Sequence, residues 1–217
     1  MKYDKWLDHD VLKLKILDGL SLEPTFGMPM MERVTEARVR NPVPFNCLSS
    51  IKNRKALWFH FYIDDYRFER VWNKFTKYVP MLTDCEGGFS PDFSMYLTMP
   101  IPQQIWNSFR NKVIGAQLQK MGKTVIPNVG FSDGKSLDFA FARIPENSIL
   151  SITSQSCLQN GVCKQSLLNG LHELCRQKHP IKLYVVGEFP ERWKDKFPVP
   201  IETVPTFART RWGGSHG

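Results

Sequence analysis

The chain has 217 residues, of which 42% are hydrophobic and 12% aromatic, which is enough for one packed core and excludes a disordered protein. Lysine and arginine outnumber aspartate and glutamate by 29 to 21, which gives a net charge of +8. This balance favours a polyanion such as a nucleic acid as partner, although the charge is spread along the chain and could serve solubility alone.

Two features of the sequence bear on the compartment. No stretch approaches the roughly 20 apolar residues that cross a bilayer, and the N-terminus MKYDKWLDHD is charged where a secretory signal turns apolar. The five cysteines are an odd number without the spacing of a disulfide framework. We therefore expect a cytoplasmic protein with free thiols and no membrane contact.

Residues 1–56 show only weak periodicity. They combine a short amphipathic stretch, WLDHDVLKLKIL, with the proline- and glycine-punctuated SLEPTFGMPMM and then NPVPFNC. We expect an N-terminal arm or lid that packs on the domain or on a partner. Flexible methionines suit an adaptable interface, and the arm carries Met28, Met30 and Met31.

Strands and helices alternate over residues 57–205, the predicted α/β domain. The apolar run 56–63 predicts a buried strand, and the spacing of apolar residues over 66–79 predicts an amphipathic helix. Residues 93–99 predict a second strand, entered through a turn at Gly87, Gly88 and Ser90 to Asp92, and 100–122 predict a second helix. The expected strands then lie at 123–129, 148–154, 182–189 and 199–204, with a short helix at 136–144 and a long one at 163–179.

This alternation predicts one α/β domain with a mostly parallel sheet of about five or six strands flanked by helices. The chain length favours a doubly wound open sheet over a full eight-unit barrel. Residues 206–217 form a basic C-terminal tail.

Sites in parallel sheets form at the carboxyl ends of the strands, where acidic and small polar residues recur in this sequence. We take Asp64, Asp92 and Asp133 as candidate catalytic residues that could act as acid, base or Mg²⁺ ligands. Asp64 ends a very apolar run, whereas Asp92 belongs to the rim only if 87–93 loops over the sheet. Secondary candidates are His60, Asp65 and Glu188. Each also has a structural interpretation: a helix cap for Asp65, a turn residue for Asp133 and a core histidine for His60.

The segment SQSCLQNGVCKQS is the best candidate for an anion site. Ser154, Gln155 and Ser156 precede a predicted helix whose N-terminal N–H groups could bind phosphate. The segment matches neither the P-loop nor the dinucleotide fingerprint. A zinc set of Cys157, Cys163, Cys175 and His179 lacks the usual ligand spacing.

The ordered blocks FHFYIDD, GGFSPDFS, VIPNVGFSD and FARIPENSILSITSQSC resemble a family of bacterial and phage proteins, the DUF4417 domain of unknown function. The resemblance covers about residues 40–190. It implies a phage or mobile-element setting and one site shared by the first two blocks, but no catalytic residue.

Two functions remain open from the sequence. The first is an enzyme that acts on a nucleotide or nucleic acid at the acidic rim. The second is a non-catalytic interaction protein, or a toxin held by an antitoxin, that engages a protein partner through the N-terminal arm.

Overall fold

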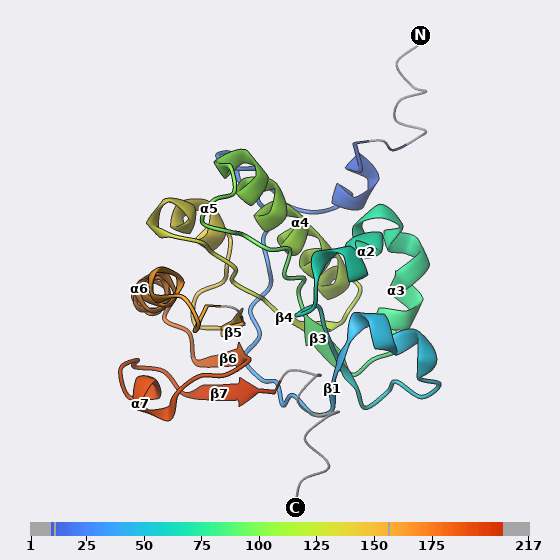
Figure 1. The fold of residues 1–217 in the computed structure, drawn as a ribbon. Coiled ribbons are helices and arrows are strands. Elements are labelled where there is room, and N and C mark those ends of the chain that lie inside the picture. Colours follow the sequence, from blue (N-terminus) through green and yellow to red (C-terminus); the bar gives the residue numbers. More distant parts are fainter. Residues whose placement is uncertain (1–9, 11, 156, 206–217) are drawn as a thin grey trace, which may run out of the picture.

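The computed structural model describes residue 10, residues 12–155 and residues 157–205, which form an α/β fold (Figure 1). Within these residues there are seven strands, and every pairing between named strands is parallel. The strands are β1 (Pro42–Pro44), β2 (Trp58–His60), β3 (Gly87–Phe89), β4 (Thr124–Ile126), β5 (Ile149–Thr153), β6 (Lys182–Val186) and β7 (Ile201–Val204).

The strands lie side by side in the order of the chain. They form a four-stranded sheet β1-β2-β3-β4 and a three-stranded sheet β5-β6-β7. A parallel bridge between Asn128 and Ser151 joins the two, with the Ser151 N–H donating to Pro127 O over 2.9 Å. A doubly wound sheet reverses its strand order at a switch point, whereas these strands keep the order of the chain. The expected doubly wound arrangement was therefore wrong.

The helices cover one face of this sheet. The longer ones are α4 and α6, and α2 to α6 lie around the outside of the strands in Figure 1. Sequential parallel strands joined by right-handed crossovers place their helices on the same face. The helices are α2 (Glu69–Asn73), α3 (Phe75–Thr83), α4 (Ile101–Lys120), α5 (Leu137–Phe141), α6 (Gly161–Lys178) and α7 (Glu191–Lys194), with short 3-10 helices at Leu14–Leu17, Phe45–Ser50, Asp65–Arg67 and Gly134–Ser136.

Residues along each strand alternate between the two faces. On β6, Leu183 and Val185 pack with the helix-side core, whereas Tyr184 and Val186 pack in a second cluster with Val34. The segment that contains Val34 passes through the middle of the molecule in Figure 1 and covers the face that the helices leave free. Each face of the sheet is therefore buried.

Hydrogen bonds fasten the N-terminal segment to the domain. The Ile149 N–H donates to Val34 O over 2.7 Å, and the Tyr184 hydroxyl donates to Ala37 O over 3.2 Å. The Gln119 side chain accepts from the Glu32 N–H over 2.8 Å and donates to Glu32 O over 3.1 Å. This irregular segment also supplies β1, and the boundary at residue 56 stays a prediction.

Of the arm residues Met28, Met30 and Met31, two belong to the core. Met28 and Met31 are fully buried, and only Met30 is exposed. They pack within the chain itself, so they do not provide the adaptable surface that the interaction hypothesis required.

The second strand is Gly87–Phe89 and does not lie at 93–99, as we expected. A Cβ on Gly88 would lie 2.2 Å from the buried Phe59 ring, and one on Gly87 would lie 2.9 Å from the Thr124 carbonyl oxygen. The two glycines are therefore needed because the neighbouring strands approach so closely, and they do not form the turn that we predicted.

Side chains of α4 hold residues 93–99 in an irregular conformation. Asn111 accepts from the Phe93 N–H over 2.7 Å, Asn107 donates to Ser94 O over 2.7 Å, and Gln104 donates to Met99 O over 2.8 Å. These amides satisfy the backbone groups that a strand would pair. The alternating apolar pattern of this segment was misleading for that reason.

The first predicted helix is also interrupted. It consists of a 3-10 turn, α2 and α3, with a break at Lys74. In the part of the chain that the structure covers, no helix is long and apolar enough to span a bilayer.

Candidate functional site

Polar residues that follow β2, β3 and β4 meet at the carboxyl-terminal edge of the sheet. Tyr62 and Asp65 follow β2, Asp92 and Ser94 follow β3, and Asn128 follows β4. Because the three strands are parallel neighbours, their carboxyl ends bring these residues together from distant parts of the sequence.

Asp92 is the centre of this group. Its Oδ1 accepts a hydrogen bond from Asn128 Nδ2 over 2.8 Å, and Asn128 Oδ1 accepts from the Tyr62 hydroxyl over 3.2 Å. Burial raises the pKa of the Asp92 carboxyl to about 6, the bond from Asn128 lowers it, and the Asp65 carboxylate raises it further. The site therefore contains a carboxyl group that exchanges a proton near neutral pH.

Space beside Asp92 is maintained by a glycine. A Cβ placed on Gly130 would lie 3.6 Å from Asp92 Oδ1, in ordinary contact, and 3.1 Å from the Met95 methyl group. A longer side chain at residue 130 would crowd the carboxyl group.

Asp65 is the second carboxylate of the site. Its two oxygens accept the Ser94 N–H over 3.3 and 3.1 Å, and its Oδ1 also accepts the Ser94 hydroxyl over 3.0 Å. Burial raises the pKa of Asp65, whereas the bonds from Ser94 and the charge of Arg110 lower it. The bonds to Ser94 hold the carboxylate in place beside the β3 loop.

Arg110 brings a buried cation to the same edge. Its guanidinium carbon lies 3.7 Å from the centre of the Phe93 ring, and its Nη1 lies 3.8 Å from Glu69 Oε1. Its Nε is buried and has no hydrogen-bond partner within the described residues. Burial lowers the pKa of Arg110, and Glu69 and Asp65 oppose that shift.

Cys157 follows β5, the strand whose Ser151 is bridged to Asn128. The pKa of the half-buried Cys157 thiol is raised by burial first, then by Cys163 and by the Asp92 carboxylate. From the sequence, Cys157 is a candidate only as a zinc ligand. Asn128, Tyr62 and Arg110 are not among the site residues predicted from the sequence.

Other sequence candidates have local structural contacts. Asp64 has an exposed side chain that accepts from Arg67 Nε over 3.0 Å. Asp133 caps the 3-10 helix at Gly134–Ser136 by accepting the Lys135 N–H over 3.0 Å. Neither is hydrogen-bonded to Asp92 or to its partner Asn128, so the structure does not bring the three predicted aspartates into one cluster.

His60 is a buried residue of β2. Its Nδ1 accepts the Tyr62 N–H over 3.3 Å, and its ring stacks on the Tyr62 ring. Burial lowers the pKa of His60 to about 4, so the imidazole is neutral at physiological pH.

The predicted phosphate loop is largely occupied by its own hydrogen bonds. The Ser154 hydroxyl donates to Glu188 O over 2.6 Å, and the Gln155 N–H donates to Thr153 Oγ1 over 3.1 Å. Ser156 lies outside the described residues. At the start of α6, Asn160 Oδ1 accepts the Val162 N–H over 2.8 Å. Phosphate binding there stays a prediction.

No set of three or more His, Cys, Asp or Glu side chains that could hold a metal ion occurs within residues 12–155 and 157–205. The suggested zinc ligands do not form such a set, and neither do the carboxylates suggested for Mg²⁺.

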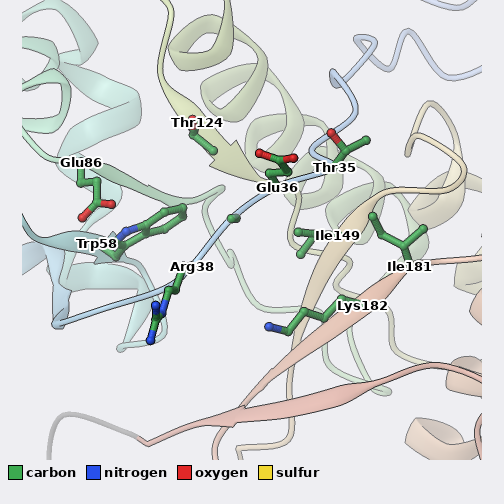
Figure 2. A pocket seen from close by; sticks show the side chains of 10 residues that line it. Thr35, Glu36, Arg38, Trp58, Glu86, Thr124, Ile149, Ile181 and Lys182 are labelled. Atoms are coloured by element: carbon green, nitrogen blue, oxygen red, sulfur yellow. The ribbon is translucent and has the colours of Figure 1, made fainter.

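A cavity of about 660 Å³ opens at the opposite, amino-terminal edge of the strands (Figure 2). Its wall includes the first residues of four strands, Trp58, Thr124, Ile149 and Lys182. The Trp58 side chain is buried, and its indole N–H has no partner among the described residues. None of the predicted site residues lines this cavity, so it is separate from the carboxyl-edge site.

Comparison with known proteins adds a setting. A family model described as "Domain of unknown function (DUF4417)" matches residues 21–204. The Gene 1 protein of Mycobacterium phage D29 is 29% identical over 198 residues, which cover 88% of this chain and 73% of the relative. The Gene 1 protein of Mycobacterium phage L5 is 29% identical over 212 residues, or 92% and 91%. No solved structure matches the chain.

Proposed function

The chain belongs to the DUF4417 family, and from that premise we propose that it is an acid–base enzyme that acts on a nucleotide or nucleic acid at the Asp92 site. The family match confirms the resemblance predicted from the sequence. Both phage relatives support the predicted setting of a phage or mobile element.

The observation that carries the proposal is the Asp92 carboxyl group, whose pKa is raised to about 6 at the carboxyl end of a central strand. A group that titrates near neutral pH is suited to proton transfer, and perturbed carboxyls cluster at functional sites. Structural ion-pair networks also perturb pKa values, but among the residues that the structure describes Asp92 forms no ion pair with a basic side chain.

The two carboxyl groups suit different roles. Asp65 accepts hydrogen bonds from the Ser94 N–H and hydroxyl and lies near the charge of Arg110, and both oppose the rise in its pKa that burial causes. Burial raises the pKa of Asp92 to about 6, so this carboxyl keeps its proton to a higher pH than an ordinary aspartate does. We assign proton donation to Asp92 and proton acceptance to Asp65, whose carboxylate is acted on by the positive charge of Arg110.

The substrate class rests on charge. A net charge of +8 favours an anionic substrate. The alternative, a protein partner engaged through the N-terminal arm, loses the support of Met28 and Met31 because both lie in the core.

The experiment is a substrate panel with matched variants. Purified protein is incubated with single-stranded RNA, single-stranded DNA, duplex DNA and mononucleotides, and products are separated by chromatography. We expect conversion of at least one class, a loss of about 10²-fold or more for Asp92→Asn, and unchanged activity for Asp133→Asn, which removes a carboxylate outside the site.

The pH dependence gives a second test. The value of kcat/KM for the wild type should change with an apparent pKa near 6. Equal activity of the Asp92→Asn variant would remove Asp92 from the mechanism. Failure of the wild type to convert any member of the panel would refute the proposed substrate class.

A further inference from the structure

The described chain exposes three aromatic residues on segments that hydrogen bonds link to one another near the Asp92 site. Large exposed hydrophobic side chains occur in many places, but only three of them are aromatic: Tyr66 at 72%, Tyr96 at 61% and Trp106 at 43% exposure. Tyr66 follows β2, Tyr96 follows β3, and Trp106 lies in the first half of α4. Exposed aromatic rings arranged in this way can bind planar groups by stacking.

Hydrogen bonds of the Asp92 site tie these three segments together. The Asp65 carboxylate accepts from the Ser94 N–H over 3.1 Å, and Asn107 Nδ2 donates to Ser94 O over 2.7 Å. Tyr66 follows Asp65 in the sequence, and Trp106 precedes Asn107. Tyr96 comes two residues after Ser94. Each of the three aromatic residues is therefore one or two positions in the sequence from a member of the hydrogen-bonded group Asp65, Ser94 and Asn107.

The ring of Trp106 is held in place by its neighbours. It contacts Trp72 edge to face at 5.3 Å between ring centres and stacks on Phe109 at 5.8 Å. Gln104 donates to the Tyr96 carbonyl over 3.3 Å and so anchors the backbone that carries the second ring. Aromatic rings fixed in advance lose little conformational freedom when they bind a partner.

One exposed basic residue, Arg67, lies beside the first of these rings. Arg70 is also exposed on the segment that follows Tyr66, but its guanidinium lies over the rings of Phe45 and Tyr78. The Arg67 guanidinium lies 5.3 Å from the Tyr66 ring centre, and its Nε also pairs with Asp64. A cation beside exposed aromatic rings suits a single strand of nucleic acid, whose bases stack on the rings and whose phosphates bind the cation.

We infer that Tyr66, Tyr96 and Trp106 form a stacking platform for single-stranded nucleic acid, with the exposed Arg67 as the cation beside it. This inference deepens the proposed function and rests on it for the chemistry at Asp92. Duplex nucleic acid is a poorer fit, because its bases are already stacked and paired.

Binding is measured by the fluorescence anisotropy of a labelled oligothymidylate of about 12 nucleotides, a length within the range of single-strand sites. The full chain is used, with a hairpin duplex of equal charge as competitor. We expect the single strand to bind more tightly than the hairpin. We also expect the affinity for the single strand to fall as the salt concentration rises.

Variants then test the three rings separately. Trp106→Ala, Tyr66→Ala and Tyr96→Ala should each weaken binding by about 5- to 150-fold, and Trp106→Phe should restore most of the loss. Met121→Ala is the control, because Met121 is an exposed apolar residue at the opposite end of α4. Tyr66 and Tyr96 are the more exposed rings, so their removal keeps the test valid even if Trp106→Ala disturbs packing.

The outcomes separate this inference from the proposed function. Asp92→Asn should bind the oligonucleotide as the wild type does, since it removes no ring. Ring-dependent binding without any conversion of substrate would refute the enzyme and leave the platform in place. Equal binding by all three alanine variants, or tighter binding of the hairpin, would overturn the platform.

Discussion

Replacing Asp92 by asparagine should stabilise the fold at neutral pH. The folded-state pKa of about 6, against an ordinary value of 3.8, corresponds to about 3 kcal/mol at about 1.4 kcal/mol per unit. Water that reaches this partly exposed carboxyl reduces the effect, so we expect a gain of about 1–3 kcal/mol. Asparagine keeps an oxygen that can accept the bond from Asn128, so little is lost in exchange.

The effect should depend on pH in a defined direction. The folded protein binds the Asp92 proton more tightly than the unfolded chain does, so this group lowers the stability of the wild type as pH rises from about 4 to about 6. The variant lacks that loss. The difference between the two proteins should therefore be near zero below pH 4 and reach its full value above pH 6.

Thermal melts of both proteins across this pH range measure the difference. A gain of 1 kcal/mol corresponds to about 2–4 °C in Tm for a chain of this size. Asp64→Asn is the control, because an exposed ion pair contributes about 0–1 kcal/mol. A variant that melts below the wild type at pH 8, or a difference that is the same at every pH, would refute the assignment of a raised pKa to Asp92.

Three further substitutions test the packing. Gly88→Ala should destabilise the fold by about 1–3 kcal/mol because the added methyl group would overlap a buried ring. Gly134→Ala is the control: its methyl group meets no atom within 4 Å, so the free energy of unfolding should change by less than about 0.5 kcal/mol. Equal urea midpoints for the two variants would contradict the close strand contact. Gln119→Ala should lower the free energy of unfolding by about 1–3 kcal/mol and speed proteolysis within residues 19–41. Gln165→Ala, at an exposed position, is the control. An unchanged cleavage pattern in the Gln119 variant would show that this amide does not anchor the segment. Trp58→Phe removes a buried N–H without a partner, and this gain offsets the lost packing. The free energy of unfolding should therefore change by about 1 kcal/mol or less. A loss above about 2 kcal/mol in a urea melt would mean that the indole N–H is hydrogen-bonded.

The strands that were predicted correctly are those with a strongly apolar composition. Residues 148–154 and 182–189 contain β5 and β6, and the periodic run 163–179 matches α6. The prediction failed at β3, because glycine suggests a turn unless the neighbouring strands are known to approach closely. It also missed β1, Pro42–Pro44, whose prolines argue against a strand that lies inside a sheet.

For the site, the sequence identified the correct edge but not the contacts. Asp92 was a candidate only if its segment looped over the sheet, and the position of β3 places it after the strand. Asp64 was favoured because it ends an apolar run, yet its side chain is exposed and Asp65 is the one that faces Ser94. Which of two adjacent carboxylates turns inward depends on the local backbone, and spacing alone does not reveal it.

The position of Val34 has a consequence for the order in which the protein can form during synthesis. Its hydrogen-bond partners Ser148 and Ile149 lie more than a hundred residues later in the chain, and the partner of Ala37 is Tyr184. The segment around Val34 leaves the ribosome early but cannot dock until most of the polypeptide has emerged. Such long-range closure is slow, and until it occurs one face of the nascent sheet is exposed. We therefore expect the final folding step to be the docking of the segment that was made first.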